Sequence, residues 1–227
     1  MNWLDNSLMD PNGRLFRLDG RLYRAMWLFD EGFYRRLLDT VSHTAVLSTG
    51  LVKTRIADLR MTEATTILEH EIIDPLIEPY AWSSRMFYEA ALRHCDIHIE
   101  LAKSGFSLQD AHLWNIAFRH GVPVFMDFGS VTDRTGKRAR VGLLREYAGY
   151  MIYPLYLMSR GQIAKARRYF HGSNPPLDRR DLMGYFGPRT GLAFLFRSVA
   201  ESVGAMRGLG EMLGAVRSHI AGLTPPP

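Results

Sequence analysis

The stretch Asp110-Ala-His-Leu-Trp-Asn115, followed by Asp127-Phe128-Gly129, is the part of this chain that bears most on its fold. Asp110 and Asn115 are five positions apart, and Asp127 comes twelve positions after Asn115. Phosphoryl transfer from ATP needs a carboxylate that orients the attacking hydroxyl and accepts its proton, together with Mg²⁺ that bridges the phosphates. Mg²⁺ prefers oxygen ligands and keeps several waters, so two protein ligands suffice. The stretch therefore predicts Asp110 as a general base and Asn115 and Asp127 as magnesium ligands.

The elements expected around this stretch bring its two parts together. Ser83 is a suitable N-cap for a long helix that runs to about Lys103 and ends at Gly105. Between the two parts of the motif, residues 115–118 and 122–126 are expected to form a short hairpin around a His120-Gly121 turn. Either part alone is a weak signal. Both in this order, with a long helix before them and a hairpin between them, are hard to produce by chance.

Residues 1–80 have the pattern of a small β-rich lobe with one helix. A hairpin is the clearest local signal, because an Asp19-Gly20 pair separates two runs of alternating polar and apolar residues. Apolar residues at helical spacing and two further alternating runs follow it. The expected elements are strands at 14–18 and 21–26, a helix at 31–46, and strands at 51–57 and 66–73.

Helices dominate the rest of the chain, with further ones expected at 141–171 and 190–222. The element order predicts an α+β fold of two lobes around a cleft. We expect a reduced, β-rich N-terminal lobe at residues 1–80. A helical C-terminal lobe, which carries the catalytic and metal-site loops, is expected at residues 81–227.

Two family resemblances rest on these segments. Asp110-x-His112-x-x-Asn115 followed by Asp127 resembles the pattern of aminoglycoside and choline phosphotransferase-like kinases. A closer resemblance, over about residues 8–190, is to the kinase-like N-terminal region that precedes the SAM-dependent methyltransferase domain of bacterial nodulation-protein-like proteins. It is carried by Gly13-Arg-Leu-Phe-Arg-Leu-Asp-Gly-Arg-Leu-Tyr-Arg24, Pro79-Tyr-Ala-Trp-Ser83, Gly105-Phe-Ser-Leu-Gln-Asp-Ala111 and Gly121-Val-Pro-Val-Phe-Met-Asp127. The resemblance implies a protein-kinase-like bilobal fold and a methyltransferase as a partner.

The chain departs from this second pattern at several points. No G-x-G-x-G cofactor loop follows a strand anywhere in it. Ala81 stands where these proteins tend to have a glutamate. In contrast, the chain keeps a complete Asp127-Phe128-Gly129 motif, which those relatives often lack.

The cation that would bind the nucleotide phosphates is not the usual one. Kinases place a lysine on the strand before the first helix, and the position that fits here is Arg24. We predict that Arg24 faces the cleft toward Asp127 and pairs with Asp39 of the following helix, or alternatively with Glu31. No G-x-G-x-x-G loop is present, and Asn12-Gly13 is a minimal substitute for it.

Composition bounds the cellular setting and the partners. The net charge is +5 and basic residues concentrate after Arg134. These basic clusters lack the interleaved aromatic residues of single-strand binders, which favours a solvated helix face, or a surface facing an anionic nucleotide or substrate, over a nucleic-acid site. A single cysteine, Cys95, fits a reducing compartment. Without a secretory pattern at the N-terminus or a run of about 18 apolar residues, we expect a cytoplasmic protein with no membrane span.

Two functions from different classes follow. The first is an ATP- and Mg²⁺-dependent phosphotransferase that acts on a hydroxyl of a small molecule or saccharide. A protein acceptor is disfavoured because no A-P-E motif follows Gly129, and only a short basic loop separates it from the next helix. The alternative is a non-catalytic kinase-like module, a pseudokinase, that binds a partner or regulates a separately encoded methyltransferase. The missing lysine and glycine-rich loop motivate this alternative.

Overall fold

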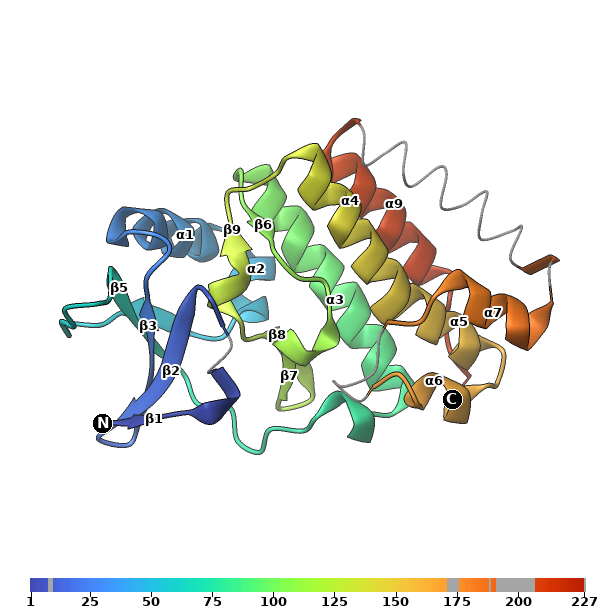
Figure 1. Cartoon of the computed structure of the whole chain (residues 1–227), viewed down its shortest axis with the longest axis horizontal. Coiled ribbons are helices and arrows are strands. Elements are labelled where there is room, and N and C mark those ends of the chain that lie inside the picture. Colours follow the sequence, from blue (N-terminus) through green and yellow to red (C-terminus); the bar gives the residue numbers. More distant parts are fainter. Residues whose placement is uncertain (8–9, 171–175, 188, 191–206, 227) are drawn as a thin grey trace.

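The computed structural model describes residues 1–7, 10–170, 176–187, 189–190 and 207–226. A five-stranded antiparallel sheet and two short helices form one end of the molecule, and a group of longer helices forms the other (Figure 1). The sheet has the strand order β1-β2-β3-β5-β4. The predicted α+β fold is confirmed, and its element order is that of a kinase-like bilobal fold.

The predicted hairpin is formed by β2 (Gly13–Leu18) and β3 (Arg21–Met26). Asp19 and Gly20 both adopt positive φ, of 50° and 76°, as a two-residue hairpin turn of this kind requires. Phe16 and Tyr23 pair across the strands and stack on the outer face, with ring centroids 5.3 Å apart. Because side chains alternate along a strand, Leu22 and Arg24 project from the opposite face, toward the helical lobe.

The helix expected at 31–46 is divided in two. α1 (Glu31–His43) is N-capped by Asp30, whose carboxylate accepts a hydrogen bond from the Phe33 N–H. Thr44 then takes an extended conformation and caps α2 (Ala45–Gly50) through its hydroxyl. The Thr44 hydroxyl offers the backbone a capping hydrogen bond in place of a continued helix. The apolar spacing that predicted one helix therefore runs across a break between two.

The two remaining strands are shorter than the alternating pattern predicted. They are β4 (Thr54–Ile56) and β5 (Thr66–His70), and β1 (Asn2–Trp3) forms the other edge of the sheet. The chain then crosses to the helical lobe through residues 71–82, which include the short 3₁₀ turn η2 (Pro79–Ala81). Trp82 is fully buried at the end of this linker, and its indole N–H donates to the Ile77 carbonyl at 2.8 Å.

The helical lobe begins with α3 (Ser84–Lys103), capped by Ser83 as predicted. β6 (Ser107–Leu108) leads to the Asp110 loop, and the 3₁₀ turn η3 (Leu113–Asn115) ends that loop. The predicted hairpin is formed by β7 (Ile116–Arg119) and β8 (Val122–Phe125), and the η4 turn (Phe128–Ser130) and β9 (Val131–Thr132) follow. β6 pairs with β9. The Asp110 loop follows β6 and the Asp127-Phe128-Gly129 turn precedes β9, so the two motif loops lie next to each other at one end of this small sheet.

The helix expected at 141–171 consists of several pieces. α4 (Lys137–Glu146) passes into a π-helical stretch, η5 (Tyr147–Ile152), before α5 (Tyr153–Ser159) and α6 (Ile163–Arg167). Pro154 lacks an N–H to donate to a preceding turn, and it stands near the start of α5. α7 (Arg179–Phe186) comes next, and α9 (Leu209–Ala221) lies within the helix expected at 190–222, most of whose first half is outside the described residues.

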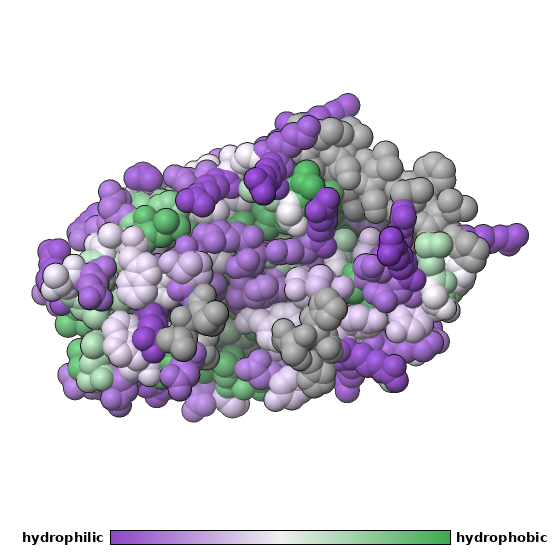
Figure 2. Space-filling view, in the orientation of Figure 1, coloured by the Kyte–Doolittle hydropathy of each residue, from purple (hydrophilic) through white to green (hydrophobic). Residues whose placement is uncertain are grey.

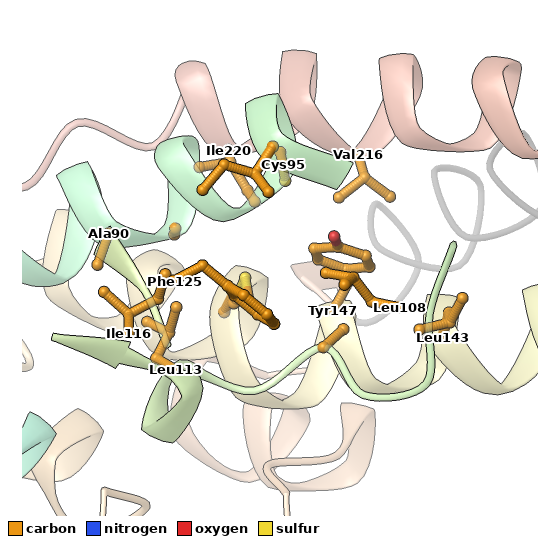
Figure 3. Packing of buried hydrophobic residues seen from close by; sticks show 14 of the residues in the cluster. Ala90, Cys95, Leu108, Leu113, Ile116, Phe125, Leu143, Tyr147, Val216 and Ile220 are labelled. Atoms are coloured by element: carbon orange, nitrogen blue, oxygen red, sulfur yellow. The ribbon is translucent and has the colours of Figure 1, made fainter. Parts of the chain in front are cut away.

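One buried cluster extends through both lobes. It contains Met26 and Leu37 from the sheet-rich part together with Phe125, Tyr147 and Val216 from the helical part. Figure 3 shows the Phe125 and Tyr147 rings between helices, with Val216 of α9 above them. A backbone hydrogen bond of 2.9 Å from the Val52 N–H to the Phe125 carbonyl adds a direct link. The two lobes therefore share one buried core.

Among the described residues, no helix has both the length and the apolar character needed to cross a membrane.

Candidate active site

A cleft of about 900 Å³ lies where the sheet faces the two motif loops. It is larger than the space one phosphate group needs and falls in the range of small-molecule and cofactor sites. Segments from both lobes line it. The polar residues that line it include Asp10, Asn12, Arg24, His70, Asp110, Asn115, Asp127 and Ser130.

Arg24 occupies the centre of this cleft. Only 10% of its side chain is exposed, and its Nη1 atom lies 2.9 Å from Asp127 Oδ1 and 2.6 Å from Asp10 Oδ2. A buried guanidinium is tolerated only when it is paired, and here two carboxylates share one nitrogen. The predicted orientation of Arg24 toward Asp127 is thus confirmed.

The predicted carboxylate partner of Arg24 in α1 is wrong. Asp39 lies on the outer face of the helix with a side chain 75% exposed, and Glu31 pairs with Arg35 one turn away. The face of α1 that packs inward contains Phe33, Tyr34 and Leu37. At 100° per residue, Asp39 is about 140° away from Tyr34 around the helix, so it cannot reach the cleft.

The carboxylate that replaces them comes from the loop before β2. Asp10 Oδ1 accepts a hydrogen bond from the Asn12 N–H at 2.8 Å, which leaves Oδ2 for Arg24. The Asn12 side-chain amide then donates to the Gly129 carbonyl at 3.0 Å. This loop is therefore tied to both Arg24 and the Asp127-Phe128-Gly129 turn.

Gly13 allows the same loop to lie against β3. A Cβ at this position would stand 2.5 Å from the Ala25 carbonyl oxygen and 2.8 Å from the Met26 sulfur. The Asn12-Gly13 pair that the sequence singled out thus has a structural reason for both of its residues.

Gly129 is required by the ion pair itself. A Cβ there would stand 2.5 Å from Arg24 Nη1 and 3.2 Å from Asp10 Oδ2. We predict that Gly129→Ala displaces the guanidinium and destabilises the protein by about 1–3 kcal/mol, as measured by denaturant unfolding. The matched control is Gly214→Ala on the exposed face of α9, where a Cβ meets no atom within 4 Å. That change should leave stability equal or raise it by up to about 1 kcal/mol, and equal loss in both variants would contradict the role of Gly129.

The Asp110 loop is fixed from the helical side. The Ala111 N–H donates to Glu146 Oε2 at the end of α4, at 2.7 Å. Burial raises the pKa of Asp110 above its ordinary value, an effect that His112 opposes and Asp127 and Asp10 increase. Burial lowers the pKa of His112. A half-buried carboxylate whose pKa is raised has the chemistry that a general base requires.

Asn115 and Asp127 offer the oxygen donors that Mg²⁺ prefers. Both contacts of Asp127 described here, to Arg24 and to the Gly129 N–H at 3.0 Å, use Oδ1. The Nδ2 atom of Asn115, the N–H donor of the amide, is buried without a hydrogen-bond partner among the described residues, so the atom available to a cation would be Oδ1. No group of three or more His, Cys, Asp or Glu residues in the described part of the chain is arranged to hold a metal. The two oxygen donors, Asn115 and Asp127, suit a cation that takes few protein ligands and completes its shell with waters and phosphates.

Other unpartnered polar atoms gather in the same cleft. Arg24 Nε, His70 Nε2 and Ser130 Oγ are buried and have no hydrogen-bond partner among the described residues. The His70 ring packs against Phe128, with ring centroids 5.8 Å apart. Burial lowers the pKa of His70 to about 3. Buried polar groups in native proteins are normally satisfied, so these atoms leave hydrogen-bonding capacity open in the cleft.

The comparisons with known proteins extend this picture. No family model matches the sequence. A curated relative, the nodulation protein NoeA of Rhizobium meliloti (strain 1021), is 26% identical over 160 residues, which cover 67% of this chain and 33% of the relative. This chain thus spans about a third of that protein's length. Among solved structures, the PknI kinase domain of Mycobacterium tuberculosis aligns with a TM-score of 0.46 and 12% identity, over 98% of this chain and 92% of that one.

Two cleft residues were missed at the level of sequence. Asp10 stands in the stretch Asp10-Pro-Asn-Gly13, whose residue types are typical of a tight turn and do not by themselves indicate a binding site. A carboxylate just before the expected phosphate loop, in a lobe with several arginines, was the available signal. His70 closes β5, and the alternating pattern that predicted the strand gave no indication that its ring borders the cleft.

Proposed function

We propose that this chain is an ATP- and Mg²⁺-dependent phosphotransferase that acts on a hydroxyl of a small molecule or saccharide. The observation that supports the proposal most is that Arg24, Asp110, Asn115 and Asp127, which come from three separate stretches of sequence, line one cleft. The predicted division into lobes at residues 1–80 and 81–227 goes with this proposal, since the cleft lies between them.

In this mechanism Asp110 orients the acceptor hydroxyl and takes its proton as the acceptor oxygen bonds to the γ-phosphorus. The bond from the γ-phosphorus to the β–γ bridging oxygen breaks, and ADP leaves with that electron pair. Asn115 and Asp127 would hold Mg²⁺, which when bound neutralises charge on the phosphates. The positive charge of the Arg24 guanidinium group attracts the phosphates, and Asp10 holds that group in position through its ion pair.

The test is nucleotide binding and turnover by the purified chain. A ligand that binds only the folded state stabilises it by mass action. For a protein of this size, Mg²⁺–ATP at about 100 times its dissociation constant should raise the melting temperature by roughly 5–10 °C. ATP without Mg²⁺ should raise it less. If Mg²⁺–ATP causes no shift and no ATP turnover is detected, the proposal is wrong.

The second candidate is a non-catalytic kinase-like module that binds a partner such as a methyltransferase. One observation favours it: Arg24 Nη1 already contacts two carboxylates, so an incoming phosphate must compete with Asp10 for it. A module of this kind would show a flat thermal response to Mg²⁺–ATP. It would instead be recovered in a complex with its partner protein, and substitutions in the cleft would not affect that complex.

The pH dependence of turnover is a further prediction. Asp110 must be deprotonated to act as a base, so kcat/KM should fall as the pH drops through its pKa. Because burial raises that pKa above the ordinary aspartate value of 3.8, the acid limb should lie at higher pH than for an exposed aspartate. Asp110→Asn should lower kcat/KM by roughly 100-fold or more. Asp133→Asn, an exposed change outside the cleft, should keep the wild-type profile, and an acid limb that persists in Asp110→Asn would assign it to another group.

A further inference from the structure

The exposed face of α4 is strongly basic, and no carboxylate in the described part of the chain pairs with it. We define the basic face of α4 as Lys137, Arg138 and Arg145 of the helix together with Arg134 of the loop before it, all of them exposed. None of the four forms an ion pair with a carboxylate among the described residues. Other exposed arginines do have such partners, as Arg55 has in Glu69 and Arg85 in Glu89. Figure 2 shows strongly hydrophilic side chains projecting from the surface over the beginning of α4.

The position of these charges is unfavourable for the helix alone. Lys137 and Arg138 stand in the first turn, where the helix dipole favours acidic residues. Gly136 is the N-cap and has no side chain to accept hydrogen bonds from the first N–H groups of the helix. An anion bound on this face would relieve the repulsion among the cations and their unfavourable placement on the dipole.

The far end of α4 reaches the catalytic loop. Glu146, the last residue of the helix, accepts the Ala111 N–H beside Asp110, and Arg145 immediately precedes it. Arg138 and Arg145 are seven residues apart, so they share a face at a separation of about 10 Å. Gly142 lies between them with open space where a Cβ would be. When both side chains extend away from the helix, their guanidinium groups lie about that far apart, which suits a ligand with two or more anionic groups along the face.

Aromatic rings border the same end of the helix. Trp114 lines the cleft next to Asn115 and packs edge-on against Tyr150 of η5, with ring centroids 5.8 Å apart. Trp and Tyr rings present a flat apolar face with a polar edge, which suits the apolar face of a sugar ring. The basic face itself has no aromatic residue between its cations, unlike single-strand nucleic-acid sites, and no apolar residue of the kind that inserts into a membrane.

We propose that the acceptor is an anionic saccharide whose reacting sugar lies on Trp114 beside Asp110 and whose acidic groups lie along the basic face of α4. This inference rests on the proposed phosphotransfer at Asp110 and names its substrate class. Binding of the acceptor is separable from nucleotide chemistry, so each can be tested alone.

The experiment measures the affinity of tetragalacturonate and of neutral maltotetraose by calorimetry, without nucleotide. Tetragalacturonate should bind, and more weakly at higher salt, while maltotetraose should bind at least tenfold more weakly. Arg138→Gln/Arg145→Gln should weaken tetragalacturonate about tenfold. The matched control Lys53→Gln/Arg60→Gln removes two exposed positive charges from the N-terminal lobe and should leave the affinity unchanged.

Several results would overturn the proposal. Equal weakening by both double variants would show only non-specific attraction to a basic protein. Tighter binding of a single-stranded oligonucleotide or of anionic lipid vesicles, lost in Arg138→Gln/Arg145→Gln, would assign the face to nucleic acid or membrane. Absence of tetragalacturonate binding in a protein that still shows the Mg²⁺–ATP thermal shift would refute the acceptor class and leave the phosphotransferase proposal standing.

Discussion

Replacing Asp127 with asparagine is expected to lower Mg²⁺-dependent ATP turnover by roughly 100-fold or more, the scale of losing one group that stabilises charge in the transition state. Asparagine keeps an oxygen that can accept from Arg24 and from the Gly129 N–H, contacts that the aspartate makes at 2.9 and 3.0 Å. What is lost is the negative charge that the proposed Mg²⁺ would meet. The fold should therefore survive while the metal dependence does not.

Steady-state turnover and the Mg²⁺–ATP thermal shift measured on the same sample separate these effects. Asp127→Asn should unfold within a few degrees of wild type without ligand and should lose most of the extra shift that Mg²⁺ adds to ATP. Asp133→Asn lies six residues on, is exposed and does not line the cleft, and it should behave as wild type. Unchanged turnover in Asp127→Asn would remove this residue from the proposed metal site.

Arg24→Ala is expected to have the second large effect, on both stability and turnover. It removes the cation that separates Asp10 from Asp127, so two partly buried carboxylates are left facing each other. Breaking a buried pair in this way typically costs about 3–5 kcal/mol, and we expect about 2–3 kcal/mol here because both carboxylates are 22% exposed. Turnover should fall roughly 100-fold through loss of the phosphate contact.

Two further variants distinguish the geometry of Arg24 from its charge. Arg24→Lys keeps the charge but not the planar fork, so it should recover part of the stability and part of the turnover. Arg14→Ala changes an arginine on the outer face of the same hairpin, where it lies over Trp3 with its Cζ atom 5.0 Å from the ring centroid. It should leave turnover within about twofold of wild type. A comparable loss of turnover in Arg14→Ala would mean that Arg24 acts only through the stability of the sheet.

Local signals in the sequence were sufficient for much of this molecule. The Asp19-Gly20 turn set the register of β2 and β3, because a two-residue loop fixes which residues pair. The Ser83 cap set the start of α3. The spacing of Asp110, Asn115 and Asp127 placed all three in one cleft, because a short hairpin between β7 and β8 returns the chain to where it started.

The boundaries of the helices could not be predicted from the spacing of apolar residues, because capping side chains and contacts with distant segments also decide where a helix ends. Apolar spacing continues through Thr44, yet its hydroxyl caps a new helix there. The region from 137 to 159 stays helical but widens to a π-helical turn around Tyr147, whose hydroxyl lies 3.0 and 2.9 Å from the Nδ1 atoms of His94 and His98. Such a polar contact between distant segments is decided by packing.

The partner of Arg24 is the clearest case of what only the tertiary structure decided. The sequence by itself determined that Arg24 lies on the face of β3 opposite Tyr23, because strand alternation is a local property; that this face would meet Asp127 followed from the kinase-like order of the elements. It did not determine which carboxylate would share that arginine, since Asp39, Glu31 and Asp10 are all within reach along the chain. α1 packs Phe33, Tyr34 and Leu37 against the core, which leaves Asp39 exposed to solvent. The hydrogen bond from Asn12 to the Gly129 carbonyl holds the loop that places Asp10 in the cleft. Packing of the backbone decides which charged groups come within a few ångströms of one another. Because charge attraction falls with distance, it is these positions that determine the ion pairs in a buried site.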